Sequence, residues 1–138
     1  MADKVQKVSY RYIHVSNRAG QGVKALEALA DAGINLVACT GFPGSGGKAQ
    51  LDFIAENAAG LGRVAKRQGW RMSPAKRAFV IQGQDRIGAV SRQLGKLARA
   101  GISITAADAV CAGAGRYGML LWVKPKDYRK AALALGAR

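Results

Sequence analysis

The sequence contains an internal repeat with a shift of 68 residues, and this repeat limits the fold to two copies of one small unit. When residues 18–36 are aligned with residues 86–104, eight of the nineteen positions are identical. The identical pairs are Arg18 with Arg86, Gly20 with Gly88, Leu26 with Leu94, Leu29 with Leu97, Ala30 with Ala98, Ala32 with Ala100, Gly33 with Gly101 and Ile34 with Ile102. We therefore predict two domains, residues 1–74 and residues 75–138, within the 138 residues of the chain.

Each copy begins with the pattern of a strand followed by a helix. Leucines three residues apart predict amphipathic helices over residues 20–32 and 88–100. Gly33 and Gly101 follow the last apolar turn, where a glycine accepts the left-handed conformation that ends a helix. β-branched and aromatic residues predict strands over residues 8–15 and 78–82 before these helices.

A hairpin and a second helix complete each copy. The predicted hairpin strands are residues 35–40 and 48–55 in the first copy and residues 103–110 and 116–124 in the second. The predicted second helices are residues 58–68 and 126–135, and the first copy adds a short strand over residues 69–73. The order βαββαβ predicts an α+β fold of two ferredoxin-like units, each an antiparallel sheet with helices on one face.

The second copy ends where its last strand would begin. One edge of its sheet must therefore be covered by the first copy or by another subunit, because an open edge invites pairing with other chains. We predict a homodimer.

Composition excludes several classes of protein. The longest apolar stretches, such as residues 119–123, are far shorter than the roughly 20 residues of a membrane span, and the first residues do not form a signal segment, so we expect a cytoplasmic protein without membrane contact. Cys39, Cys111 and the single histidine have no metal-binding spacing. We expect no metal, no cofactor and no catalytic activity, because no nucleophile has an adjacent base.

Two glycine-rich segments resemble phosphate-binding loops in sequence pattern but not in predicted structural context. The segment before Lys48 has Phe42 where a P-loop needs glycine, and residues 113–118 match GxGxxG. Both precede predicted strands, whereas a phosphate-binding loop must open a helix with free amides. We interpret both as hairpin turns.

The two loops that enter the first helices are the candidate binding segments. Asn17 or Asp85 can accept hydrogen bonds from the first helix amides as an N-cap. Alternatively, the same amides and the positive helix end can bind a ligand carboxylate. His14 lies just before the first loop, as a structural residue at a strand end or as a ligand contact.

These segments carry a family resemblance. Asn17-Arg18-Ala19-Gly20, followed by a helix and by Ala32-Gly33-Ile34-Asn35-Leu36, resembles the signature of ACT domains, and residues 85–104 are similar. The first copy is particularly similar to the serine-sensing regulatory ACT domain of phosphoglycerate dehydrogenase, whose two binding asparagines match Asn17 and Asn35. The resemblance implies a ligand-binding set of His14, Asn17, Arg18, Ala19, Gly20, Gln21, Asn35 and Leu36 in the first copy and of Asp85, Arg86, Ile87, Gly88, Ser103 and Ile104 in the second.

We therefore predict a stand-alone regulatory or sensor protein that binds a small amino acid or a related anionic metabolite and acts on a separate enzyme. The alternative is a basic ferredoxin-like protein that binds nucleic acid, because the net charge is +14 and residues 63–77 contain a run of lysines and arginines. The strand at residues 116–122 argues against this alternative, since its aromatic residues do not fit the RNA-recognition pattern.

Overall fold

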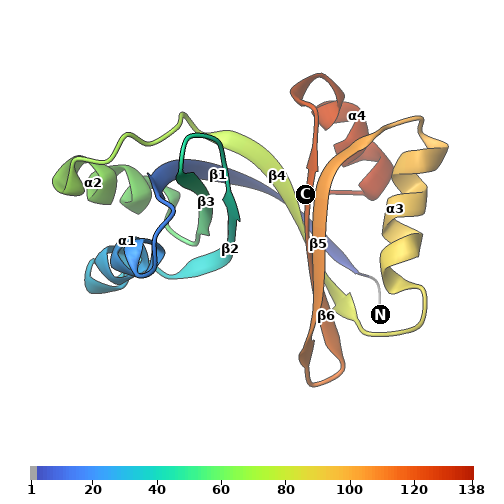
Figure 1. Ribbon diagram of the computed structural model, residues 1–138. Helices are drawn as coiled ribbons and strands as arrows, with labels where there is room; N and C mark the ends of the chain where they lie inside the picture. Colours follow the sequence, from blue (N-terminus) through green and yellow to red (C-terminus); the bar gives the residue numbers. More distant parts are fainter. Residues whose placement is uncertain (1–2) are drawn as a thin grey trace. The chain divides into compact units, whose positions relative to one another are not determined.

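The structure is a computed structural model that describes residues 3–138, and it has an α+β fold (Figure 1). The elements are β1 (Lys4–Ser16), α1 (Gln21–Asp31), β2 (Leu36–Pro43), β3 (Lys48–Ala55), α2 (Ala58–Gln68), β4 (Lys76–Gln84), α3 (Ala89–Arg99), β5 (Ile104–Gly113), β6 (Arg116–Val123), the 3-10 turn η1 (Pro125–Asp127) and α4 (Tyr128–Leu135). The strand order β2-β3-β1-β4-β6-β5 confirms the prediction of ferredoxin-like units.

The chain divides into two compact units. Residues 9–76 form one, here called the N-terminal unit, and residues 77–138 with residues 3–8 form the other, the C-terminal unit. The boundary predicted at residue 74 lies close to the end of the N-terminal unit, but residues 3–8 group with the C-terminal unit. Strand β1 therefore contributes its beginning to one unit and its end to the other.

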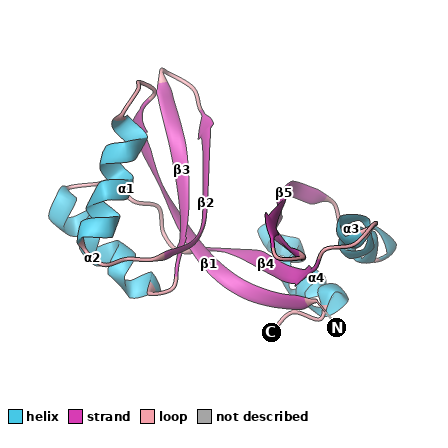
Figure 2. Cartoon of the chain, turned by 90° about the horizontal axis from the view of Figure 1, so that it is seen from below, coloured by secondary structure: helices cyan, strands magenta, loops and turns pink. Residues whose placement is uncertain are grey.

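The N-terminal unit packs α1 and α2 against one face of β1, β2 and β3 (Figures 1 and 2). Strand β3 pairs antiparallel with both neighbours, and Ser16 of β1 lies opposite Lys48. Alternate residues of the strands face the helices, which gives a core of Ile13, Ala25, Leu29, Phe53, Leu61 and Val64. This core contains the apolar helix face that the leucine spacing predicts.

The C-terminal unit has its own core, formed by β4, β6, α3 and α4. Phe79, Leu97 and Leu121 in it are fully buried. Strand β1 lies beside β4, and its residue Val5 belongs to this core. The backbone of β1 also binds the end of the chain, since the Lys7 amide donates to the Arg138 carbonyl (2.9 Å) and the Arg138 amide donates to the Val5 carbonyl (3.0 Å).

The missing strand of the second copy is thus supplied by the beginning of the same chain, which was one of the two predicted solutions. The position that a last strand occupies in a ferredoxin-like sheet, next to the first strand, is filled by residues 4–8 of β1. The sheet edge next to β4 is therefore covered without a second subunit, and the homodimer stays a prediction.

The predicted strand over residues 69–73 is wrong. This segment has no strand conformation, although it lies along β1: the Ser73 amide donates to the Tyr12 carbonyl (2.9 Å), and the Tyr12 amide donates to Ser73 Oγ (2.9 Å). A side-chain oxygen takes the place of a backbone acceptor, and the following Pro74 has no amide to continue the ladder.

The predicted helix stops are confirmed at Gly33 and Gly101. Both glycines have positive φ, 73° and 72°. The amides of Gly33 and Ile34 donate to the carbonyls of Ala30 and Leu29, and Gly101 and Ile102 repeat this pattern with Ala98 and Leu97. These are the two hydrogen bonds of a Schellman motif. The last predicted helix begins later than residue 126, because Pro125 starts a 3-10 turn before α4.

Candidate functional site

The two loops that enter α1 and α3 have the same backbone conformation. Each passes through a left-handed glycine at the helix cap, Gly20 with φ 87° and Gly88 with φ 82°. Each loop is also tied to the hairpin turn of its own unit: the Asn17 amide donates to the Gly47 carbonyl (2.9 Å), and the Asp85 amide donates to the Gly115 carbonyl (2.8 Å). The repeat in the sequence is therefore a repeat of this loop geometry.

The expected N-caps by Asn17 and Asp85 are not formed. The cap residues are Gly20 and Gly88, three positions further along the chain, and neither helix has a side-chain cap hydrogen bond. Neither the Val90 amide nor the Ser91 amide donates a backbone hydrogen bond to any residue of the described range 3–138. Helix α3 therefore begins with free amides, as an anion-binding helix end requires.

A pocket of about 270 Å³ lies at this entrance of α3. It is bounded by the loop, the first turn of α3, and residues of β5 and β6. The lining residues are Asp85, Arg86, Gly88, Ala89, Val90, Ser91, Ala109, Val110, Cys111 and Tyr117. Three predicted site residues, Asp85, Arg86 and Gly88, thus line one pocket, whereas the predicted Ile87 is fully exposed and does not line it.

The polar groups of the pocket carry both signs of charge. The Arg86 guanidinium donates to the Gln84 carbonyl (3.2 Å) and lies 3.6 Å from the Asp3 carboxylate. On the other side, the hydrogen bond to Asp85 raises the pKa of the Cys111 thiol, with burial and the charge of Asp85 adding to the shift. A cation, an anion and free helix amides in one pocket match the two charged groups of a zwitterion.

A buried polar cluster under this pocket was not predicted from the sequence. Asp3 accepts hydrogen bonds from the Tyr117 hydroxyl (2.6 Å) and from Gln93 Nε2 (2.7 Å), and its side chain is only 3% exposed. Burial works against ionisation of Asp3, but these two hydrogen bonds and the charges of Arg86 and Lys96 bring its pKa below the ordinary value. Burial, the hydrogen bond to Asp3 and the charge of Asp3 raise the pKa of Tyr117 to about 12.

Asn17 and Asn35, the pair implied by the resemblance, do not meet within the N-terminal unit. The Asn17 amide donates to the carbonyl of Gly47, which directly precedes β3. Asn35 Nδ2 donates to Oε1 of Glu56 (2.9 Å), which directly follows β3. A strand rises about 3.3 Å per residue, so the two ends of this eight-residue strand are more than about 20 Å apart. One small ligand cannot touch both asparagines of a single unit.

The other predicted site residues are distributed in the same way. Arg18, Ala19, Gly20 and the half-buried Gln21 lie with Asn17 at the entrance of α1, where Arg18 Nε donates to Ser16 Oγ (3.1 Å). Leu36 lies beside Asn35 and packs against the core. In the C-terminal unit, Ser103 and Ile104 follow the end of α3 and are remote from Asp85, Arg86 and Gly88 at its start.

His14 is exposed on β1, where it lies opposite Gln50. Its ring contacts the Tyr12 ring edge to face, with 5.5 Å between the centroids. His14 lies on the strand that leads to the α1 entrance, and its role as a structural residue or as a ligand contact stays a prediction.

Residues 3–138 contain neither a cluster of metal-ligating side chains nor a helix that could span a membrane. No group of three or more histidine, cysteine or acidic side chains in this range could hold a metal ion. No helix of the described chain has the length and apolar character needed to cross a membrane.

Comparison with known proteins yields similarities of fold only. No protein-family model and no curated protein matches the chain. Among solved structures, protein BT0572 from Bacteroides thetaiotaomicron is similar with a TM-score of 0.81 and 19% identity, over 96% of this chain and 88% of that one. The ligand-free regulatory subunit of aspartate kinase from Thermus thermophilus has a TM-score of 0.65 and 14% identity, over 98% and 93%.

The corresponding regulatory subunit from Thermus flavus has a TM-score of 0.55 and 21% identity, over 98% of this chain and 94% of that one. The matches cover 96% to 98% of the present chain, so the likeness includes residues of both units and is not limited to one ferredoxin-like domain. The chain therefore has the fold of the regulatory subunits of aspartate kinase.

Proposed function

We propose that this chain is an ACT-type regulatory protein that binds a small amino acid or a related anionic metabolite and has no catalytic activity of its own. It acts on a separate enzyme partner, in the cytoplasm and as a homodimer. The fold shared with regulatory subunits of aspartate kinase supports the regulatory role. The sequence motifs at Asn17 and Asp85 support the ACT assignment.

The observation that carries the proposal is the uncapped start of α3 inside a pocket. The amides of Val90 and Ser91 and the guanidinium of Arg86 offer donors for a carboxylate, and the Asp85 carboxylate offers an acceptor for an ammonium group. The Ala89, Ala109 and Val110 side chains leave an apolar wall for a small side chain. A volume of about 270 Å³ suits a ligand the size of an amino acid.

Isothermal titration calorimetry of the full chain against the twenty amino acids tests this proposal. We expect binding of at least one amino acid, and Arg86→Gln to weaken it about tenfold to hundredfold, because a hydrogen bond to a charged group contributes about 1.5–3 kcal/mol. Asp85→Asn should also lower the affinity for the same ligand, since the side chain that faces the ligand's ammonium group loses its charge.

The matched control is Arg92→Gln, which removes an exposed cation from α3 outside the pocket and should leave the affinity unchanged. Arg18→Gln, the equivalent change at the α1 entrance, shows whether the first copy also binds. An amino-acid ligand is ruled out if none of the twenty gives heat, and the proposed site is wrong if Arg92→Gln weakens binding as much as Arg86→Gln.

A further inference from the structure

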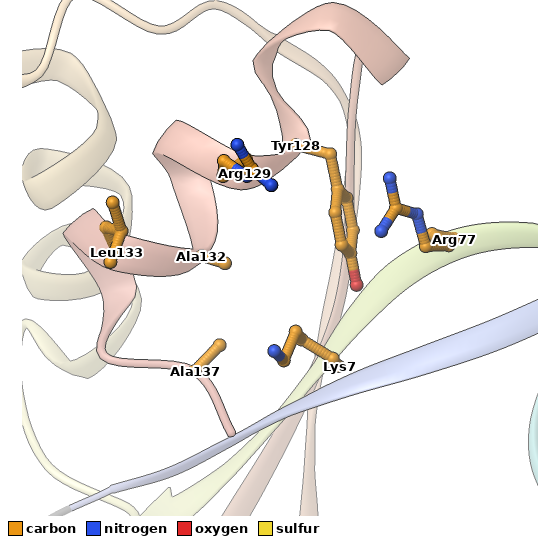
Figure 3. Close-up of a pocket in the computed structure, with 7 residues that line it drawn as sticks. All are labelled: Lys7, Arg77, Tyr128, Arg129, Ala132, Leu133 and Ala137. Carbon is orange, nitrogen blue, oxygen red and sulfur yellow. The ribbon is translucent and has the colours of Figure 1, made fainter.

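A second pocket lies in the C-terminal unit, between α4 and the neighbouring strands β1 and β4. Its volume is about 620 Å³, and it shares no residue with the pocket at the α3 entrance. Lys7 comes from β1, Arg77 from β4 and Arg129 from α4, while Ala132, Leu133 and Ala137 supply apolar surface (Figure 3). Three segments far apart in the sequence thus form one basic pocket.

No acidic side chain lines this pocket. Three of its lining residues are cations. Across residues 3–138, the ion-pair distance of 4.0 Å is met only by Arg86 and Asp3, so Lys7, Arg77 and Arg129 have no carboxylate partner in this range. Cations gathered around a hollow raise the local concentration of anions.

Arg77 is held in place by a cation–π contact and not by an ion pair. Its guanidinium lies 4.2 Å from the centre of the Tyr128 ring. That ring is itself fixed, because it stacks on Phe79 (4.5 Å, 8°) and its hydroxyl donates to the Ala78 carbonyl (2.9 Å). A contact with an aromatic ring does not neutralise the guanidinium, so its N–H groups can still donate to an oxyanion.

The apolar part of the pocket limits the class of ligand. Leu133 is 80% exposed, and Figure 3 shows it on α4 in the same pocket as Ala132 and Ala137. An inorganic ion would leave this surface exposed to water, whereas an organic group attached to the anion would cover it. The volume also lies in the range of pockets for small organic molecules.

We propose that this pocket is a second ligand site, which binds a small organic phosphate through Lys7, Arg77 and Arg129. The phosphate lies against the three cations, and the organic group packs on Leu133 and the two alanines. The site is separate from the entrance of α3, so the protein can respond to two different small molecules.

The test is an NMR titration of the ¹⁵N-labelled full chain with phenyl phosphate and with inorganic phosphate at constant ionic strength. We expect saturable shifts of the Lys7, Ala132 and Ala137 amides, and tighter binding of phenyl phosphate. Arg77→Gln and Lys7→Gln should each weaken it about tenfold, as loss of a charge-assisted hydrogen bond does. Arg77→Lys keeps the charge and should give an intermediate loss.

The control variant Arg116→Gln removes an exposed cation at the start of β6, outside both pockets, and should leave the affinity unchanged. Arg86→Gln should also leave it unchanged, which separates this site from the proposed amino-acid site. Equal losses in Arg116→Gln and Arg77→Gln would show unspecific attraction of anions and overturn the proposal. It would also be overturned by a single-stranded RNA 12-mer that binds more tightly than phenyl phosphate and requires Arg77 and Lys7.

Discussion

Asp3 is a buried carboxylate that links the beginning of the chain to the candidate amino-acid site. Its partners Tyr117 and Arg86 both line the pocket at the α3 entrance, and Gln93 belongs to α3 itself. A Cβ atom at Gly83 would overlap both Asp3 and Tyr117, so only glycine allows this close approach. The geometry of the pocket therefore depends on a residue more than eighty positions away in the sequence.

We predict that Asp3 makes the stability of the protein sensitive to acid. Its pKa is lowered in the folded protein, so the stabilisation is present above its unfolded value near 3.8 and is lost as the pH falls through the lower folded pKa. Asp3→Asn should lower the free energy of unfolding by about 1.5–3 kcal/mol at neutral pH, the contribution of hydrogen bonds to a charged group. The difference from the wild type should shrink on acidification.

Urea denaturation between pH 2 and pH 7 measures this effect. Tyr117→Phe serves as a second variant, because it removes one donor to Asp3 and should cause a smaller loss with the same pH dependence. A constant difference between Asp3→Asn and the wild type over the whole range would show that the charge of Asp3 does not stabilise the fold.

At the scale of elements, a glycine inside α3 and the glycine that follows its end should respond in opposite ways to substitution by alanine. Gly101 ends the helix with φ 72°, and nothing lies within 4 Å of a Cβ built there, so Gly101→Ala should cost about 1–2 kcal/mol through backbone strain alone. Gly95 lies inside the helix, and a Cβ there would meet only the flexible end of Arg99 at 3.2 Å. Gly95→Ala should stabilise the protein by about 0.5–1 kcal/mol.

Thermal and urea unfolding of the two variants, each compared with the wild type, measures both changes in stability. Because both changes add one methyl group to the same helix region, side-chain hydrophobicity cannot account for opposite signs. Destabilisation of similar size in both variants would contradict the assignment of the helix end to the left-handed glycine.

Elements defined by local pattern could be predicted from the sequence, and those defined by distant pairing could not. Strand β3 and helix α2 have the predicted bounds, since turn glycines and an asparagine cap mark their ends. The strand character of residues 4–7 and its absence in residues 69–73 depend on which backbone groups find a partner. That pairing is decided by tertiary structure, which local propensity does not contain.

The same division applies to the candidate sites. The entrance loops are contiguous segments, so the repeat was enough to find Asp85, Arg86 and Gly88. Tyr117 and Cys111 reach the same pocket from a hairpin, and Lys7, Arg77 and Arg129 meet only after β1 lies beside β4. No spacing in the sequence indicates these contacts, because the residues belong to three separate elements.

At the scale of the whole molecule, β1 is the one strand within residues 3–138 whose residues belong to both cores. Val5 lies in the core of the C-terminal unit, and Ile13 lies in the core of the N-terminal unit. Because the two cores are separate, each unit can unfold locally with its own free energy of opening. Amide hydrogen exchange measures this free energy for each unit. A substitution in one half of β1 should therefore weaken mainly the unit to which that half belongs.

We predict that Val5→Ala lowers the free energy of unfolding by about 2 kcal/mol and accelerates hydrogen exchange in β4, β6 and α4. Ile13→Ala should lower it by about 2–5 kcal/mol and accelerate exchange in β3, α1 and α2. Hydrogen-exchange mass spectrometry of the full chain resolves the two sets of peptides. Val37→Ala, a truncation at an exposed position of β2, is the control and should change neither set. If both core variants accelerated exchange equally throughout the chain, the two units would unfold as one cooperative body, and ligand binding at the α3 entrance would then stabilise the N-terminal unit as strongly as the C-terminal one.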